Sequence, residues 1–141
     1  MKQISLFFVL PLFIIGCETP IDQQYIYDYS IEQFRGCFCT NGGIWINLYI
    51  KGDTVAAAYK ISNDQELNYE EFKYYKSIKG LFDLITNTDT TKYELRYTID
   101  SVKNYPTFIY LNPKPIIIGN DTLIIADAQL SYTTRNYINY E

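Results

Sequence analysis

The chain has 141 residues, of which 48% are hydrophobic and 17% aromatic, and its formal net charge at pH 7 is −4. An acidic balance argues against a nucleic-acid-binding role, which normally requires a basic patch. The sequence contains no histidine, which excludes Ser-His-Asp and Cys-His catalytic arrangements and His-containing zinc sites. We therefore expect no metal site and no cofactor.

The N-terminus has the features of an export signal. Lys2 provides a positive start, and residues 4–15 are almost entirely apolar. This run is too short for a membrane-spanning helix, which needs about 20 residues, but it is typical of a signal-peptide core. Residues 14–17, Ile-Ile-Gly-Cys, resemble a lipobox, in which the cysteine takes a diacylglycerol before the peptide bond preceding it is cut.

Three segments are therefore predicted: a lipoprotein signal peptide (1–16), a polar tether (17–24) and a single α+β domain (25–141). Cys17 is the predicted lipidation site, carrying palmitate or a similar acyl chain. The expected location is the cell envelope, with the N-terminal lipid as the membrane contact. Glu18 after the lipidated cysteine favours the outer membrane if the host is Gram-negative.

The first half of the domain has strand patterns. Residues 25–39 alternate like a strand, and 40–43 (Thr-Asn-Gly-Gly) form a strong turn signal. Residues 44–51 and 54–61 predict a hairpin joined by a Lys-Gly-Asp turn. One face of its first strand carries Ile44, Ile46, Leu48 and Ile50, and the other carries Trp45, Asn47, Tyr49 and Lys51.

A helix is predicted after a polar, ambiguous stretch at 62–76. Ser77 fits an N-cap, and apolar residues follow at helical spacing as far as about Asn87: Ile78, Leu81, Phe82 and Ile85. From this stripe we expect Phe82 to be buried between the helix and a sheet. The receiving surface is expected to include Ile46, Leu48, Leu95 and Tyr97.

The second half predicts further strands. Residues 92–100 give the cleanest alternation, with Tyr93, Leu95, Tyr97 and Ile99 on one face. Shorter strands are expected at 107–111, 116–118, 122–126 and 128–134. The predicted fold class is α+β: a mainly antiparallel sheet with one principal helix packed across one face, and a more polar opposite face.

Cys37 and Cys39 are the two cysteines left after lipidation. In an exported protein such a pair favours a disulfide. Residues i and i+2 of an extended strand lie roughly 6.5–7 Å apart, at or beyond the usual disulfide limit, so a bridge needs a local bend. Two buried thiols, or a redox or metal role, are the alternatives, and two thiolates alone make an incomplete metal site.

Several segments in order resemble an uncharacterised family of small bacterial envelope lipoproteins and secreted proteins. They are the tyrosine-rich strand ending in Cys-x-Cys, the hairpin with a Gly turn, a Ser-Ile-x-x-Leu-Phe-x-x-Ile helix and the segment 100–106 (Asp-Ser-Val-Lys-Asn-Tyr-Pro). The chain has Ile99 where the family tends to have Tyr and Asn104 where it has Gly. Asn tolerates the left-handed conformation, so the turn can persist. The resemblance implies the fold and the envelope location, and no activity.

Two classes of function are compatible with these observations. The first is a non-catalytic binding or accessory module for an envelope protein or glycan, using the sheet face that carries Trp45 and Tyr49. Alternatively, a neighbouring loop or the tether covers these two aromatic residues, and they do not form a binding surface. The second is an envelope enzyme, thiol-redox or sugar-directed, which would require reactive thiols at Cys37 and Cys39 or opposed carboxylates in a pocket.

Overall fold

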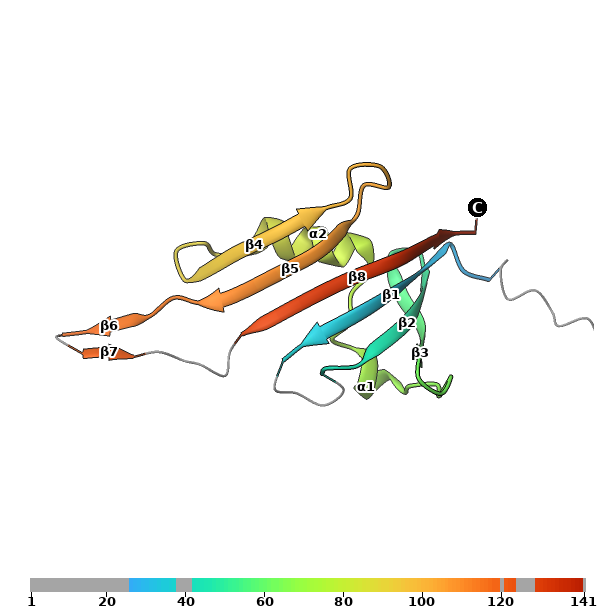
Figure 1. Ribbon diagram of the computed structural model, residues 1–141, viewed down its shortest axis with the longest axis horizontal. Coiled ribbons are helices and arrows are strands. Elements are labelled where there is room, and N and C mark those ends of the chain that lie inside the picture. The colour runs from blue at the N-terminus through green and yellow to red at the C-terminus, as the bar shows by residue number, and fades with distance from the viewer. Residues whose placement is uncertain (1–25, 38–41, 120, 124–128, 141) are drawn as a thin grey trace, which may run out of the picture.

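The computed structural model describes residues 26–37, 42–119, 121–123 and 129–140 (Figure 1). Its main element is a six-stranded antiparallel sheet with the strand order β3-β2-β1-β8-β5-β4. The strands of this sheet are β1 (Tyr29–Gly36), β2 (Trp45–Lys51), β3 (Thr54–Lys60), β4 (Tyr93–Ile99), β5 (Pro106–Pro113) and β8 (Leu130–Asn139). A separate two-stranded sheet pairs β6 (Ile116–Ile118) with β7 (Asp121–Leu123), and the helices are α1 (Tyr69–Phe72) and α2 (Ile78–Asn87).

The predicted α+β class is wrong: the described fold is mainly β. The two helices have only four and ten residues, whereas β8 alone has ten and pairs with both β1 and β5. The apolar residues of α2 do form a stripe, but the strands supply most of the buried apolar side chains, and α2 supplies only Leu81. The helix therefore covers part of a sheet and does not organise the core.

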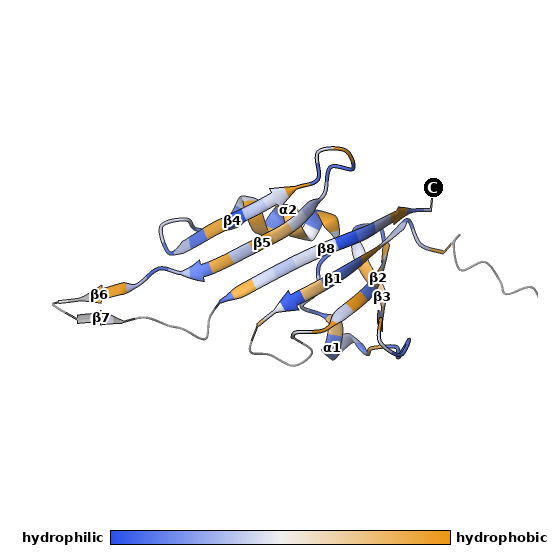
Figure 2. Cartoon of the chain, in the orientation of Figure 1, coloured by the Kyte–Doolittle hydropathy of each residue, from blue (hydrophilic) through white to orange (hydrophobic). Residues whose placement is uncertain are grey.

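The core lies on one face of the sheet, in two clusters of buried residues. Hydrophobic and hydrophilic residues alternate along the strands, as Figure 2 shows, so that alternate side chains reach the same face. The first cluster covers β1–β3 and contains Ile31, Ile46, Leu48, Ile50, Ala58, Leu67 and Tyr75. The second lies under α2 and contains Leu81, Ile109, Leu111 and Tyr132. Burial of Ile46, Leu48 and Ile50 confirms the predicted inward face of the hairpin.

The predicted burial of Phe82 is wrong. Leu81 is fully buried, whereas Phe82 is only partly buried and lies outside both clusters. Successive residues are about 100° apart around a helix, so only one of these two neighbours can point directly at the sheet. Of the helix stripe, Ile78 packs against the cluster that contains Ile46 and Leu48, whereas Leu81 and Ile85 belong to the second cluster.

The segment between α1 and α2 is fixed to the sheet by three side chains. The amide of Gln33, which is fully buried, donates to the Lys76 carbonyl and accepts from the Lys76 N–H, both at 3.0 Å. The Tyr132 hydroxyl donates to the Tyr74 carbonyl at 2.9 Å, and the Tyr29 hydroxyl accepts from the N–H of Ile78 at 3.0 Å. These bonds satisfy backbone groups that helical hydrogen bonds do not reach, and they place the start of α2.

The segment 100–106 is a structured turn between β4 and β5. The Asp100 carboxylate accepts from the N–H groups of Val102 and Lys103, both at 2.8 Å, and these bonds lower the pKa of Asp100. Asn104 has φ +54°, so it does adopt the left-handed conformation expected from its position. Tyr105 and Pro106 are buried. This part of the resemblance is therefore explained by local structure.

Candidate interaction face

The two helices and the segment joining them pack on one face of the sheet, and the other face carries neither helix. We call the latter the helix-free face. It is formed by side chains of β1, β2, β3 and β8 that alternate with the core residues: Glu32, Phe34, Trp45, Asn47, Tyr49, Tyr59 and Arg135. Trp45 and Tyr49, the predicted binding-face residues, both lie on it and are half-buried.

Trp45 lies in a group of contacts that spans three strands. Its ring lies 5.6 Å from that of Phe34 on β1, between centroids, at an interplanar angle of 49°. From β8, the guanidinium carbon of Arg135 lies 3.9 Å from the centroid of the Trp45 ring, a cation–π distance. The Nε of Arg135 also donates to Glu32 at 2.8 Å. These contacts orient the indole while leaving part of it accessible.

Tyr49 lies two residues further along β2, in a group of tyrosines. Its ring centroid is 5.0 Å from that of Tyr27 and 5.8 Å from that of Tyr59, the latter pair edge to face. A tyrosine phenol is already neutral at physiological pH, and burial raises the pKa of the Tyr49 phenol further. Its oxygen accepts from the Asn47 amide at 3.2 Å, which leaves the hydroxyl proton able to donate to a ligand.

The structure thus joins Trp45 and Tyr49 into one strip along β2, with Asn47 between them. Sequence reasoning missed Phe34, Arg135 and Tyr59 as members of this face, and it missed the contact of Tyr27 with Tyr49. Alternation within the hairpin could have indicated Tyr59, which pairs with Asn47 across β2 and β3. Arg135 could not have been found in that way, because its place depends on the pairing of β1 with β8, which includes a register shift between Ser30 and Glu32.

The cysteine predictions fall mostly outside the described residues. Cys17 and Cys39 both lie there, as does the predicted signal peptide. Cys37 is half-buried directly after β1 and lines a cavity of about 340 Å³ together with Gly36 and Ser131. A disulfide between Cys37 and Cys39 therefore stays a prediction.

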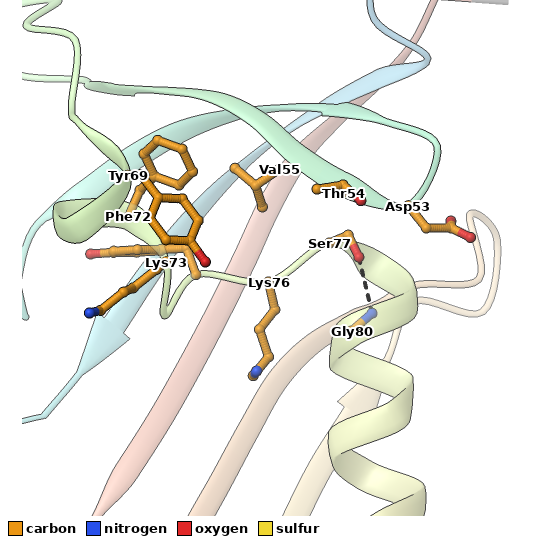
Figure 3. Close-up of a pocket in the computed structure, with 10 residues that line it drawn as sticks. Asp53, Thr54, Val55, Tyr69, Phe72, Lys73, Lys76, Ser77 and Gly80 are labelled. Atoms are coloured by element: carbon orange, nitrogen blue, oxygen red, sulfur yellow. Dashed lines mark hydrogen bonds between the residues drawn. The ribbon is translucent and has the colours of Figure 1, made fainter.

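A second cavity, of about 260 Å³, lies between the β2–β3 turn and the segment from α1 to α2 (Figure 3). Two of its polar lining groups are engaged in local structure. The Ser77 hydroxyl caps α2 by accepting from the N–H of Gly80 at 3.1 Å, and the Lys73 ammonium pairs with Glu70. Asp53 and Thr54 lie on the opposite side, on the hairpin. This lining does not set a nucleophile beside a base, which catalysis of acyl or glycosyl transfer would need.

The described part of the chain shows neither a cluster of metal ligands nor a helix suited to span a membrane. Within it, no three residues of the His, Cys, Asp and Glu types gather as metal ligands would. In the same part, neither helix has the length and hydrophobicity that spanning a membrane requires.

Fold and face together define a small antiparallel β domain with a preordered aromatic surface. The model of a family of unknown function, DUF6174, matches residues 21–137, and the chain belongs to this family. The expected membership of an uncharacterised family is confirmed at this level. No curated protein and no solved structure matches the chain.

Proposed function

We propose that this protein is a lipid-anchored lipoprotein of the bacterial cell envelope whose domain binds a partner protein through the helix-free face. The anchor is supported by the sequence of residues 1–17. The geometry of the domain is compatible with it. At Asp28 the described chain enters the sheet. Its N–H donates to the Ile50 carbonyl, and its carbonyl accepts from the N–H of Tyr140. The chain entry, the β2–β3 turn and the end of β8 therefore lie at the same end of the sheet. The β6–β7 hairpin projects from the opposite end (Figure 1) and would point away from the membrane.

Cys17→Ala is expected to abolish lipidation and leave an unprocessed precursor, because the cysteine thiol is the predicted acceptor. Metabolic labelling with a clickable fatty acid, followed by gel fluorescence, measures this directly. Cys37→Ala serves as the matched control and should label like the unsubstituted chain. Equal labelling of the Cys17→Ala variant would contradict the proposed anchor.

Binding through the helix-free face is supported above all by the ordered Trp45–Arg135 contact. Tryptophan, tyrosine and arginine are the residue types that most often dominate the energy of protein interfaces. Here they are half-exposed yet fixed by neighbours, so little side-chain entropy would be lost on binding. The Arg135–Glu32 pair adds both signs of charge beside the aromatic rings, which suits a polar protein surface.

Trp45→Ala is expected to weaken binding of the envelope partner about 30-fold, the loss typical of a central interface tryptophan. The partner would be identified by cross-linked co-purification of the full chain from envelopes, and the affinity then measured with purified components. Tyr69→Ala is the matched control: Tyr69 is an aromatic residue on α1, away from this face, and 67% exposed. Equal affinities of the two variants would contradict the proposal, as would retention of an envelope glycan in place of a protein.

A further inference from the structure

The two edges of the six-stranded sheet differ. Along β3, residues 65–67 cover the edge: the N–H of Lys60 donates to the Gln65 carbonyl, and the N–H of Leu67 donates to the Ala58 carbonyl, both at 2.9 Å. Along β4, the other edge, no described segment pairs on the outer side. An open edge strand presents unpaired backbone groups and is a template for another strand, so proteins normally cover or block it.

β4 is also the least buried strand of the sheet. None of its seven residues is buried, although its sequence alternates as a core strand does. Tyr93, Tyr97 and Ile99 are 40%, 50% and 38% exposed, and they lie on the side of the sheet that holds the core. The apolar side of this strand is thus left partly uncovered next to an open edge.

The register with β5 fixes which backbone groups of β4 point outward. The N–H of Lys114 donates to the Lys92 carbonyl at 2.8 Å, so these two residues form a hydrogen-bonded pair. Every second residue along β4 forms the next such pair, which gives Glu94 with Asn112 and Arg96 with Tyr110. In an antiparallel ladder such residues direct their N–H and C=O groups to the partner strand, and the residues between them direct theirs away. Leu95 and Tyr97 therefore present their backbone groups at the open edge.

We propose that β4 pairs antiparallel with β4 of a second copy of this chain, about a two-fold axis through Leu95. In this register Leu95 faces Leu95 of the second copy, and Tyr93 faces Tyr97, so that the outward backbone groups meet. Glu94 then faces Arg96 of the other copy, and Arg96 faces Glu94, forming two ion pairs between the strands. Within one chain these same side chains already bond to each other, with 2.8 Å between Arg96 Nε and Glu94 Oε1, and both are solvent-accessible.

Two neighbouring registers would use the same outward backbone groups. A two-fold axis through Tyr93, the first residue of β4, would oppose the rest of the strand to residues that precede it and leave most of β4 unpaired. The other neighbouring register is disfavoured by charge. A two-fold axis through Tyr97 would place Glu94 opposite Asp100, the residue that follows β4, and so bring two negative charges near each other. The axis through Leu95 instead matches opposite charges on one side of the ribbon and aromatic rings on the other, both of which stabilise cross-strand pairs. One acid and one base, two residues apart, thus permit this self-pairing where two like charges would prevent it.

Cross-linking in the full chain tests the pairing. Directly opposed residues of a hydrogen-bonded antiparallel pair have Cα atoms about 5.5 Å apart, which suits a disulfide. Leu95→Cys should therefore give a disulfide-linked dimer on non-reducing gels of isolated envelopes, at a level well above the unsubstituted chain. Thr98→Cys is the matched control: in this register the two Thr98 residues would be roughly 20 Å apart, so no dimer is expected.

Charge variants in the Leu95→Cys background test the register. Glu94→Arg should reduce the cross-linked fraction about tenfold, because each ion pair becomes a like-charge pair. Adding Arg96→Glu to that variant restores opposite charges and should restore the dimer. As a second measurement with exposed positions only, co-expressed Tyr93→Cys and Tyr97→Cys chains should cross-link to each other. No dimer from either cysteine arrangement, equal cross-linking through Thr98→Cys, or indifference to Glu94→Arg would overturn the proposal.

Discussion

Leu81→Ala is expected to lower the free energy of unfolding by about 2–5 kcal/mol, the cost of truncating a fully buried leucine. Leu81 is the buried residue of α2 and packs with Ile109, Leu111 and Tyr132, so its loss would leave a cavity between the helix and the sheet. In a domain of this size that is a large share of the total stability. Urea denaturation followed by circular dichroism measures the change.

Phe82→Ala, the adjacent substitution, is expected to cost only about 1 kcal/mol, because the Phe82 side chain is partly exposed and lies outside the clusters. Lys79→Ala on the exposed side of α2 should leave the urea midpoint almost unchanged, since its ion pair with Asp83 lies in solvent. A larger loss of stability for Phe82→Ala than for Leu81→Ala would mean that α2 is rotated about its axis, with Phe82 and not Leu81 facing the sheet.

Gln33→Leu is expected to cost about 2–4 kcal/mol. Leucine fills a similar volume but leaves the N–H and the carbonyl of Lys76 without the bonds that Gln33 provides. Unsatisfied backbone groups in a buried setting cost about 1–3 kcal/mol each. The segment between α1 and α2 should loosen, and hydrogen exchange at the Lys76 amide should accelerate along with the loss in urea stability.

Gln33→Glu gives the same site a dependence on pH. The protonated carboxyl can still donate to the Lys76 carbonyl, whereas the carboxylate is repelled by it and is poorly solvated. Burial would therefore raise the pKa of this carboxyl in the folded state above its unfolded value. The variant's relative stability should be greatest at acidic pH and be lost as the pH rises through the raised pKa. Parallel stability curves for Gln33→Glu and the unsubstituted protein would contradict this role of Gln33.

Local patterns predicted the parts of the fold that depend on near neighbours. The β2–β3 hairpin follows from its Gly-Asp turn, and the inward face of β2 follows from the alternation of its residues. The N-cap at Ser77 follows from its side-chain acceptor. Each of these features depends on a few adjacent residues. The balance of helix and sheet depends on pairing between distant segments. β8 extends to Asn139 beside β1, well past the predicted end at 134, and this pairing makes the fold mainly β.

Two errors show what periodicity cannot determine. A helical stripe that contains both Leu81 and Phe82 does not determine which of them faces the sheet. Similarly, the alternation of β4 is the same for a central strand and an edge strand, so the exposure of Tyr97 was not predictable from it. At the helix-free face, alternation predicted that Trp45 and Tyr49 share one side, but the Arg135 contact comes from a register formed only in the folded chain.

Site-specific photocrosslinking in living cells tests most directly the claim that the helix-free face is the binding surface. A photoreactive phenylalanine derivative would replace Tyr49 in one full-length chain and Tyr69 in another, since both are tyrosines but only Tyr49 lies on that face. The account predicts a discrete adduct with one envelope protein from position 49, absent when Trp45→Ala is added, and none from position 69. Adducts from position 69 alone, or a position-49 adduct unaffected by Trp45→Ala, would contradict it.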